Sequence, residues 1–511
     1  MSMLGAVARM KALRDGRAVP LASVRHVRLA QDPLVLIPLR LAGEAAAPLA
    51  AMVGNHPDKA RVLLVPQPRN RDLRFAFFAE LGRIVLGEVA AATENAETIE
   101  IKRGERKGET YERYLDAPQI LVPNRPAIEF LRLAGRATRF RQTEGEWPVA
   151  PEVPVLGRWL TWFADRSDYP GASALCAMTE LLAQHWASGQ SSMEDGNLAA
   201  LLGWIDPGPR LAGLMGAPSP ERYRTGQDMA TLAEDPLTVP PAGPTTDPTF
   251  DNEVLAPTIA VYDTAPEGPA REHAEELLRA RLTEQMEPTW RLMWHAVGLL
   301  RELPEAAHVP ARFEGDRQSF TNFEESLDEG LPQARHDGAV AAARRLASLE
   351  GAASRYTVQR ALDDPLVMAE HRLTGEAFRG EVVWTDPDNV NEKGLRRPLV
   401  QLITPDRLRI EPGMTVHNAS RTQKAAVLEV DGDTVTLRIE NGMGNARKPL
   451  PGSIPEQGQR LCFTTFADEF RPGGSLPEPE ETPWTHGGPP EDRTEPNETA
   501  AEEMTHERED A

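Results

Sequence analysis

A β-hairpin close to the C-terminus is the feature that most constrains how this chain folds. Residues 426–430, Ala-Val-Leu-Glu-Val, are typical of a strand, and the Asp-Gly-Asp that follows at 431–433 is typical of a tight turn. Residues 434–439 then alternate between apolar and polar side chains, so one face of the second strand is buried and the other faces water. The side chains that we expect in a core are Val427, Val435, Leu437 and Ile439.

Two strands are not stable alone, so the hairpin requires neighbours that complete a sheet. Four further segments have the composition of strands: residues 378–384, 397–403, 414–418 and 459–466. Short strands at this spacing are typical of a small barrel. The sequence therefore predicts one small β-barrel over residues 376–470.

The first part of the chain alternates strand and helix patterns, which favours an α/β domain over residues 1–145. Strands are predicted at residues 33–41, 61–66, 98–102 and 119–124. Helices are predicted at residues 43–53, 75–92 and 125–140. The expected fold class of the whole chain is thus multidomain, α/β plus α-helical, with the small barrel at its C-terminal end.

Two helical regions are predicted between this domain and the barrel, at residues 146–205 and 271–375. The first carries an apolar stripe at helical spacing that we assign to a core, because large aromatic side chains prefer burial: Leu156, Trp159, Trp162 and Phe163. Residues 206–270 hold 12 prolines and are predicted to be a linker, since no helix is expected to run through that density. Asp364 before Pro365 predicts the start of the last helix before the barrel.

The C-terminal end is strongly acidic. From residue 476 to residue 511 there are 12 acidic residues and two arginines, so this stretch holds about half of the chain's net charge of −21. Such a Pro/Glu/Thr-rich segment cannot bury a core, and residues 471–511 are predicted to be a disordered tail. The overall charge argues against a protein that binds nucleic acid over its whole surface.

Several classes of protein are excluded by what the sequence lacks. Two cysteines far apart, Cys176 and Cys462, give no disulfide framework and no metal-binding pair, which fits a reducing cytoplasm. No apolar run is long enough to span a bilayer, and no signal sequence is recognisable. None of the seven lysines stands in a phosphate-binding Gly-Lys-Ser/Thr loop, and no zinc or dinucleotide motif occurs. We expect no cofactor, no bound metal and no membrane partner.

One short motif points to an enzyme. Glu100-Ile101-Lys102, on a predicted strand, matches the Glu-x-Lys end of restriction-endonuclease-like nucleases. Such sites hold a divalent metal between the Glu and an upstream carboxylate, while the Lys assists the attacking water. The upstream acid would be Asp72, Glu88 or Glu94. Alternating charges on the wet face of an ordinary strand look the same, and we expect Glu100 and Lys102 to be structural or exposed.

The barrel is the stronger candidate for a site. Between residues 376 and 470 there are 12 basic and 14 acidic residues, a nearly neutral balance in an acidic chain. The basic residues gather in predicted turns, from which they could contact phosphates: Arg396, Arg397, Arg421, Lys424, Arg447 and Lys448. Ordinary solvated surface charge is the alternative explanation.

The hairpin, from Gly413 through residue 439, resembles those of SH3-like and KOW-type barrels, with a Gly-hydrophobic start, a strand, an acidic-Gly turn and an alternating strand. Helices that lead into a barrel resemble the accessory barrel of superfamily 1 helicases of the nonsense-decay type. The motor motifs of those helicases are missing here. The resemblance implies a module that contacts nucleic acid or a helicase partner.

Two classes of function follow, with a third alternative. The first is a non-enzymatic cytoplasmic adaptor whose barrel contacts DNA or RNA through phosphates, or an ATPase or helicase acting in trans. The second is a metal-dependent nuclease built on the N-terminal domain, and the third is a scaffold that binds only protein.

Overall fold

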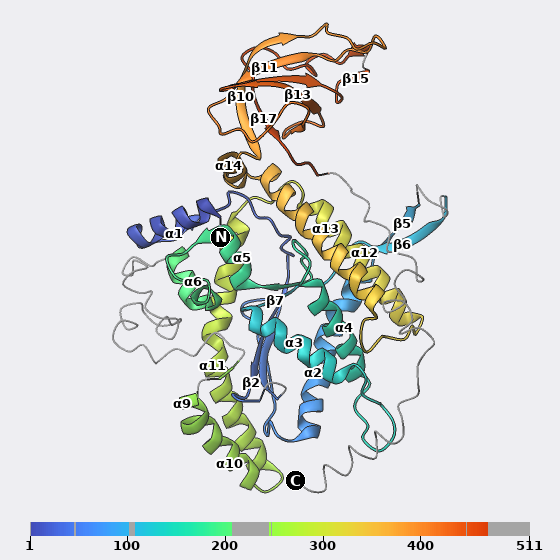
Figure 1. Cartoon of the computed structure of the whole chain (residues 1–511). Helices are drawn as coiled ribbons and strands as arrows, with labels where there is room; N and C mark the ends of the chain where they lie inside the picture. The colour runs from blue at the N-terminus through green and yellow to red at the C-terminus, as the bar shows by residue number, and fades with distance from the viewer. Residues whose placement is uncertain are drawn as a thin grey trace, which may run out of the picture.

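The computed structural model describes residues 2–44, 47–101, 108–206, 245–246, 248–445 and 447–468. A mixed α/β body carries a small barrel at one end, and the two are joined by helices (Figure 1). The tail predicted at residues 471–511 lies outside the described residues. Within the described part of the chain, no helix has the length and apolar character needed to cross a membrane.

A five-stranded mixed sheet forms the centre of the body. Its strands are, in spatial order, β4 (Arg61–Leu64), β3 (Pro48–Gly54), β2 (Leu34–Arg40), β7 (Ile120–Val122) and β8 (Leu175–Ala177). The first three form an antiparallel meander, and β7 and β8 join parallel to β2. Every residue from Leu34 to Leu39 is buried, as expected of a strand covered on both faces.

Helices cover both faces of this sheet. The face that carries Leu34 and Leu36 packs against four helices: α2 (Arg71–Ala92), α3 (Arg125–Thr138), α4 (Glu152–Arg166) and α12 (Val309–Asp328). The face that carries Val35 and Ile37 packs against three others: α5 (Met178–His185), α6 (Leu198–Ile205) and α11 (Pro269–Glu302). The body is therefore a three-layer α/β/α arrangement (Figure 1).

The aromatic stripe of α4 lies in the first of these cores, as predicted. Trp159 is 1% exposed and Phe163 is fully buried. Trp159 also contacts Phe320 and Phe323 of α12, with ring centroids 5.5 and 4.8 Å apart. Helix α12, which no sequence pattern singled out, is thus packed on the same core.

Two element assignments in the body were wrong. Residues 43–53 were predicted to be a helix, but Pro48–Gly54 forms β3, because it pairs on both sides, with the buried strand β2 and with the edge strand β4. Leu175–Ala177, which the sequence places in a helical region, is edge strand β8. In both places tertiary pairing overrides the helix preference of alanine.

The predicted linker is also partly helical. Residues 207–244 lie outside the described part, but Pro248–Phe250 (α9) and Ala256–Thr264 (α10) are helices, with a π-helical turn at Asp251–Leu255. Pro257 lies just after the π-helical turn, inside a continuous helical segment from residue 248 to residue 264. Proline density therefore did not exclude a helix here.

Smaller elements complete the body. Helix α1 (Met3–Asp15) precedes a short two-stranded sheet of β1 (Val19–Pro20) and β9 (Trp186–Ala187). A 3₁₀ turn occupies Glu194–Gly196. Strands β5 (Ala96–Glu100) and β6 (Thr110–Tyr114) form a separate two-stranded ribbon that projects from the body (Figure 1).

The predicted barrel is present. Its six strands close in the order β10 (Ala377–Asp386), β11 (Leu399–Ile403), β14 (Thr434–Ile439), β13 (Lys424–Asp431), β12 (Thr415–Asn418) and β17 (Arg460–Thr464), and all pairs are antiparallel. A small ribbon of β15 (Gly444–Asn445) and β16 (Lys448–Pro449) extends from it. Val427, Val435, Leu437 and Ile439 are at most 1% exposed. Gly432 has φ of 57°, the left-handed conformation that the tight turn requires.

Helices α13 (Ala339–Asp363) and α14 (Pro365–Thr374) connect the body to the barrel. Asp364 caps α14 as predicted, accepting a hydrogen bond from the Leu366 N–H at 2.9 Å. Its carboxylate also accepts from the backbone N–H and the hydroxyl of Ser23, at 2.6 and 2.9 Å. One buried side chain thus ties the N-terminal segment to the helix that leads into the barrel.

Candidate nucleic-acid interface

The six basic residues predicted on the barrel lie at neighbouring strand ends. Arg396 and Arg397 precede β11, whose first residue pairs with the end of β14. Arg421 and Lys424 lie at the start of β13, which pairs with the same end of β14. Arg447 and Lys448 belong to the β15–β16 ribbon and are exposed.

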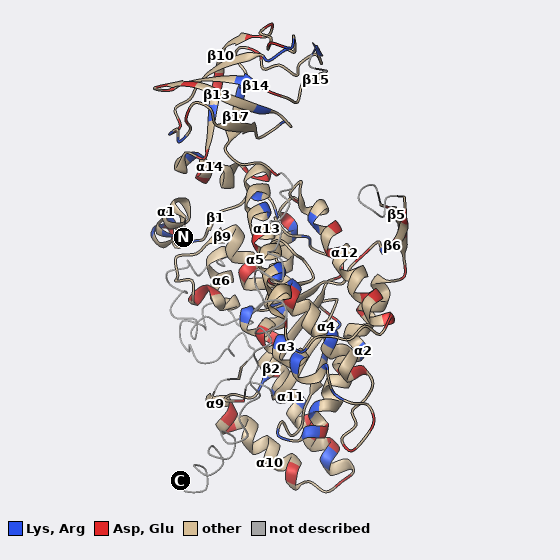
Figure 2. Ribbon diagram, turned by 45° about the vertical axis from the view of Figure 1, so that its right-hand side comes forward, with Lys and Arg blue, Asp and Glu red and all other residues tan. Residues whose placement is uncertain are grey.

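Nearby groups already engage several of these cations. Arg396 forms an ion pair with Asp388, and the Nε of Arg397 lies 3.1 Å from a carboxylate oxygen of Glu440. Arg421 donates a hydrogen bond of 3.1 Å to the carbonyl of Gly452. The strand ends therefore carry mixed charge (Figure 2). Of the six basic residues, Arg447 and Lys448 are exposed and the other four are half-buried.

The residues of the nuclease hypothesis are not gathered into a site. Glu100 is exposed on the projecting β5–β6 ribbon, and Lys102 lies outside the described residues. Asp72 is exposed and paired with Arg71 at 2.7 Å, while burial raises the pKa of Glu88. The five strands of the central sheet carry no Asp or Glu. No cluster of three metal-binding side chains occurs in the described part of the chain.

An arginine-rich pocket that the sequence analysis missed lies where α3 ends, beside α4 and the segment before α13. Its volume is about 690 Å³. Its charged lining consists of Arg136, Arg139, Arg141, Arg335, Arg345, His336, Asp165 and Asp337. Sequence reasoning passed over these arginines because the chain holds 49 of them, and because residues 136–141 and 334–337 are far apart in sequence.

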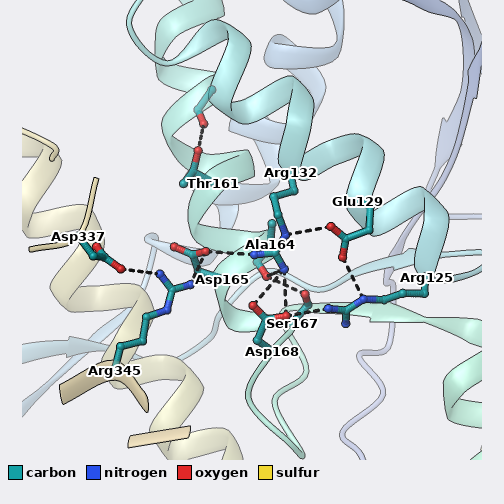
Figure 3. A network of polar contacts seen from close by, with 11 residues as sticks. Arg125, Glu129, Arg132, Thr161, Ala164, Asp165, Ser167, Asp168, Asp337 and Arg345 are labelled. Carbon is teal, nitrogen blue, oxygen red and sulfur yellow. Dashed lines mark hydrogen bonds and ion pairs between the residues drawn. The ribbon is translucent and has the colours of Figure 1, made fainter. Parts of the chain in front are cut away.

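A network of ion pairs next to this pocket joins α3, α4 and α13 (Figure 3). Arg345 of α13 contacts Asp165 at 2.6 Å and Asp337 at 3.2 Å. Arg132 of α3 contacts Asp168 at 2.9 Å and Asp165 at 3.5 Å. Asp168 and Glu129 also accept from Arg125, at 2.8 and 3.1 Å. Both acidic residues of the pocket are therefore already engaged by Arg345.

The other four arginines of the pocket have no ion pair with any described carboxylate. The guanidinium groups of Arg139 and Arg335 lie 4.7 and 5.3 Å from the ring centroid of Phe140. Arg139 also donates to the carbonyl of Arg335 at 3.2 Å. Burial, which disfavours the charged form, lowers the pKa of Arg139, while the charges of Asp165 and Asp337 partly oppose this and that of Arg136 adds to it. The pocket thus concentrates positive charge in an acidic protein.

A second polar cluster lies at the junction with the barrel and is closed to solvent. His26, His185 and Asp364 are fully buried. The Nδ1 of His185 donates to the carbonyl of Leu181 at 2.6 Å, so its Nε2 accepts from the His26 backbone N–H at 3.2 Å. Burial lowers the pKa of His26 to about 3 and that of His185 to about 4. With its histidines neutral and no access from outside, this cluster has a structural role.

Comparison of the chain with family models, with curated proteins and with solved structures finds no match in any of the three.

Proposed function

We propose that this protein is a non-enzymatic cytoplasmic adaptor whose C-terminal barrel contacts the phosphate backbone of DNA or RNA. A nucleic-acid-processing partner such as a helicase, acting in trans, would be the enzyme of such a complex. The SH3-like or KOW-type character of the hairpin, and its likeness to the accessory barrel of superfamily 1 helicases, support this proposal by resemblance.

The observation that carries the proposal is the placement of the barrel. It has a core of its own, built around Phe378, Leu437 and Phe463, and stands at one end of the molecule in both views (Figures 1 and 2). Its β15–β16 ribbon, whose Arg447 and Lys448 are exposed, extends from the barrel at the end far from the central sheet (Figure 2). A domain that stands at one end of the molecule and leaves its β15–β16 ribbon exposed is well placed to meet a long, charged partner.

The mixed charge of the strand ends sets the expected strength of binding. Because Asp388 and Glu440 neutralise Arg396 and Arg397, we expect weak binding that depends little on base sequence. Trp384 is the one Trp between residues 376 and 470, and this span has no Tyr, so base stacking on the barrel is not expected.

Binding of fluorescent oligonucleotides to the isolated barrel, residues 376–468, tests the proposal. Affinity should fall steeply as salt rises, and replacing Arg421, Lys424, Arg447 and Lys448 with Ala should abolish it without unfolding the domain. The control variant removes four exposed cations elsewhere on the barrel, Arg379, Arg407, Arg409 and Arg460, and should retain binding. No affinity for DNA or RNA even at low salt would leave only a protein partner for the barrel.

A further inference from the structure

The pocket at the end of α3 has the charge of a site for phosphate. Five arginines line it against two aspartates, and Arg345 engages both aspartates. The other four arginines of the lining therefore have no ion pair with a carboxylate among the described residues. The Nε of Arg139 is buried and has no hydrogen-bond partner there either. Planar guanidinium groups bind phosphate oxygens in pairs, which makes phosphate the ligand that fits these donors.

Helix α13 adds to the positive potential of this pocket. The helix begins at Ala339, two residues after Asp337, and its N-cap residue Gly338 provides no side-chain acceptor for the N–H groups of the first turn. A helix N-terminus carries a partial positive charge that attracts anions. A second pocket, of about 1170 Å³, has a nearly balanced charge, since its four arginines are accompanied by three acidic residues: Asp316, Glu350 and Asp468.

Exposed aromatic rings flank the arginines. Phe140, in the pocket lining, is 38% exposed, and Trp147, in the same α3–α4 loop, is 66% exposed. The guanidinium of Arg71 lies 5.6 Å from the Trp147 ring centroid, and that of Arg141 lies 5.2 Å from the Phe75 ring centroid. Arginines interleaved with exposed rings are typical of surfaces on which unpaired bases stack while the phosphates are held.

We infer that residues 136–147, together with residues 334–337, form a binding surface for single-stranded nucleic acid. The strand's phosphates lie against Arg136, Arg139 and Arg335, and one of its bases stacks on the ring of Phe140. Glu144 and Glu146 make the Trp147 end of the loop less positive, so the main phosphate contacts lie at the pocket. This inference rests on the nucleic-acid half of the proposed function and adds a second contact, on the body.

The test uses the full chain and a fluorescein-labelled oligodeoxythymidylate, with a duplex of the same length and inorganic pyrophosphate as separate arms. The double variant R136Q/R335Q should weaken binding of the single strand and reduce its log–log salt slope by about 1.4, since each lost contact to a single strand contributes about 0.7. F140A should weaken it about tenfold, as expected for loss of one stacking ring. The control R14Q/R17Q removes the same charge from α1 and the turn after it, which lie across the body from α12 and the ribbon in both views, and should bind as the parent protein does (Figures 1 and 2).

The remaining outcomes separate this inference from the proposal for the barrel. If the four-alanine barrel variant abolishes binding in the full chain while R136Q/R335Q and F140A leave it unchanged, the inference fails and the barrel proposal stands. If R136Q/R335Q and F140A weaken binding while the four-alanine barrel variant leaves it unchanged, the result supports this surface and contradicts a role of the barrel in binding. Equal affinity for duplex and single strand, or binding of pyrophosphate with no effect of F140A, would overturn the assignment to single-stranded nucleic acid. Unchanged thermal midpoints exclude misfolding of the variants.

Discussion

At the scale of single residues, the buried cluster at the barrel junction shows what a local pattern can and cannot predict. The Asp-Pro pair at 364–365 predicts a helix cap, and Asp364 is one. Nothing in the sequence indicates that the same carboxylate binds Ser23, 341 positions away, or that two histidines pack beside it. Such contacts depend on the tertiary fold, which brings the N-terminal segment against the start of α14.

The histidines of this cluster predict a loss of stability in mild acid. In the unfolded chain a histidine titrates near pH 6.5, whereas the folded pKa is about 3 for His26 and about 4 for His185. Below pH 6.5 the unfolded state therefore binds more protons, and the free energy of unfolding falls as the pH falls, by about 2 kcal/mol per histidine at pH 5. Urea unfolding at pH 7.5 and pH 5 measures this. His26→Leu should roughly halve the pH effect, because only one of the two histidines then remains to titrate. The ring nitrogens of His26 have no hydrogen bond to lose in this variant. An unchanged pH dependence would contradict the assignment.

Asp364 itself should be costly to remove. Asp364→Ala deletes the cap of α14 and leaves both donors of Ser23 without an acceptor, which predicts a loss of about 3 kcal/mol in the free energy of unfolding. Asp364→Asn retains one carbonyl oxygen and should lose clearly less. Urea unfolding of the two variants at pH 7.5 measures the difference. Equal losses would show that charge, and not hydrogen bonding, dominates at this position.

At the scale of elements, the crossing of α3 and α4 depends on two glycines. A Cβ atom on Gly157 would lie 2.3 Å from the backbone nitrogen of Arg139, and one on Gly135 would lie 2.9 Å from that of Thr161. These contacts are with backbone atoms, which cannot rotate away. The close approach of the two helices places Arg139 and Phe140 at the pocket and lets the ion-pair network span α3 and α4 (Figure 3).

Gly157→Ala should therefore destabilise the protein, although alanine is the better helix former. We expect a loss of at least about 1–3 kcal/mol from overpacking. Gly87→Ala is the matched control, since a Cβ atom on this exposed glycine of α2 would have nothing within 4 Å, and the variant should gain up to about 1 kcal/mol from helix propensity. Chemical unfolding of both variants decides the matter. Stabilisation by both substitutions would mean that the helices do not approach this closely in solution.

Elements with a strong period were predicted well, and elements defined by their partners were not. The alternation at 434–439 determined the buried face of β14, and the stripe of α4 from Leu156 to Phe163 is buried as its spacing indicated. The alanine-rich β3 was misassigned because its strand state depends on pairing with both β2 and β4. The Glu100 motif was recognised on the correct strand, but a ribbon and a central sheet cannot be distinguished from sequence.

At the scale of the whole molecule, the arginine-rich pocket exists only because distant segments meet. Residues 136–141 and 334–337 are separated by about two hundred positions, and their charges have no special meaning in a chain with 49 arginines until the fold places them together. The same chain ends in a stretch of net charge −10, so the acidic tail and the basic surfaces belong to one molecule. Opposite charges linked covalently meet at high effective concentration, which makes competition between the tail and a nucleic acid a testable expectation.

Deletion of residues 476–511 should accordingly tighten binding of single-stranded nucleic acid to the full chain. The Debye length is about 8 Å at 0.15 M salt, so a tail that stays away from the basic surfaces would change affinity little through charge alone. Replacing the 12 acidic residues of the tail by their amides should reproduce the gain while keeping its length, which separates charge from steric exclusion. If the tail competes at the pocket, the gain disappears in the R136Q/R335Q background; if it competes at the barrel, the gain disappears in the four-alanine barrel variant instead. The thermal midpoint should not change on deletion, because a segment that cannot bury a core adds no packed element to the fold. A drop of several degrees would show that the tail packs on the rest of the protein.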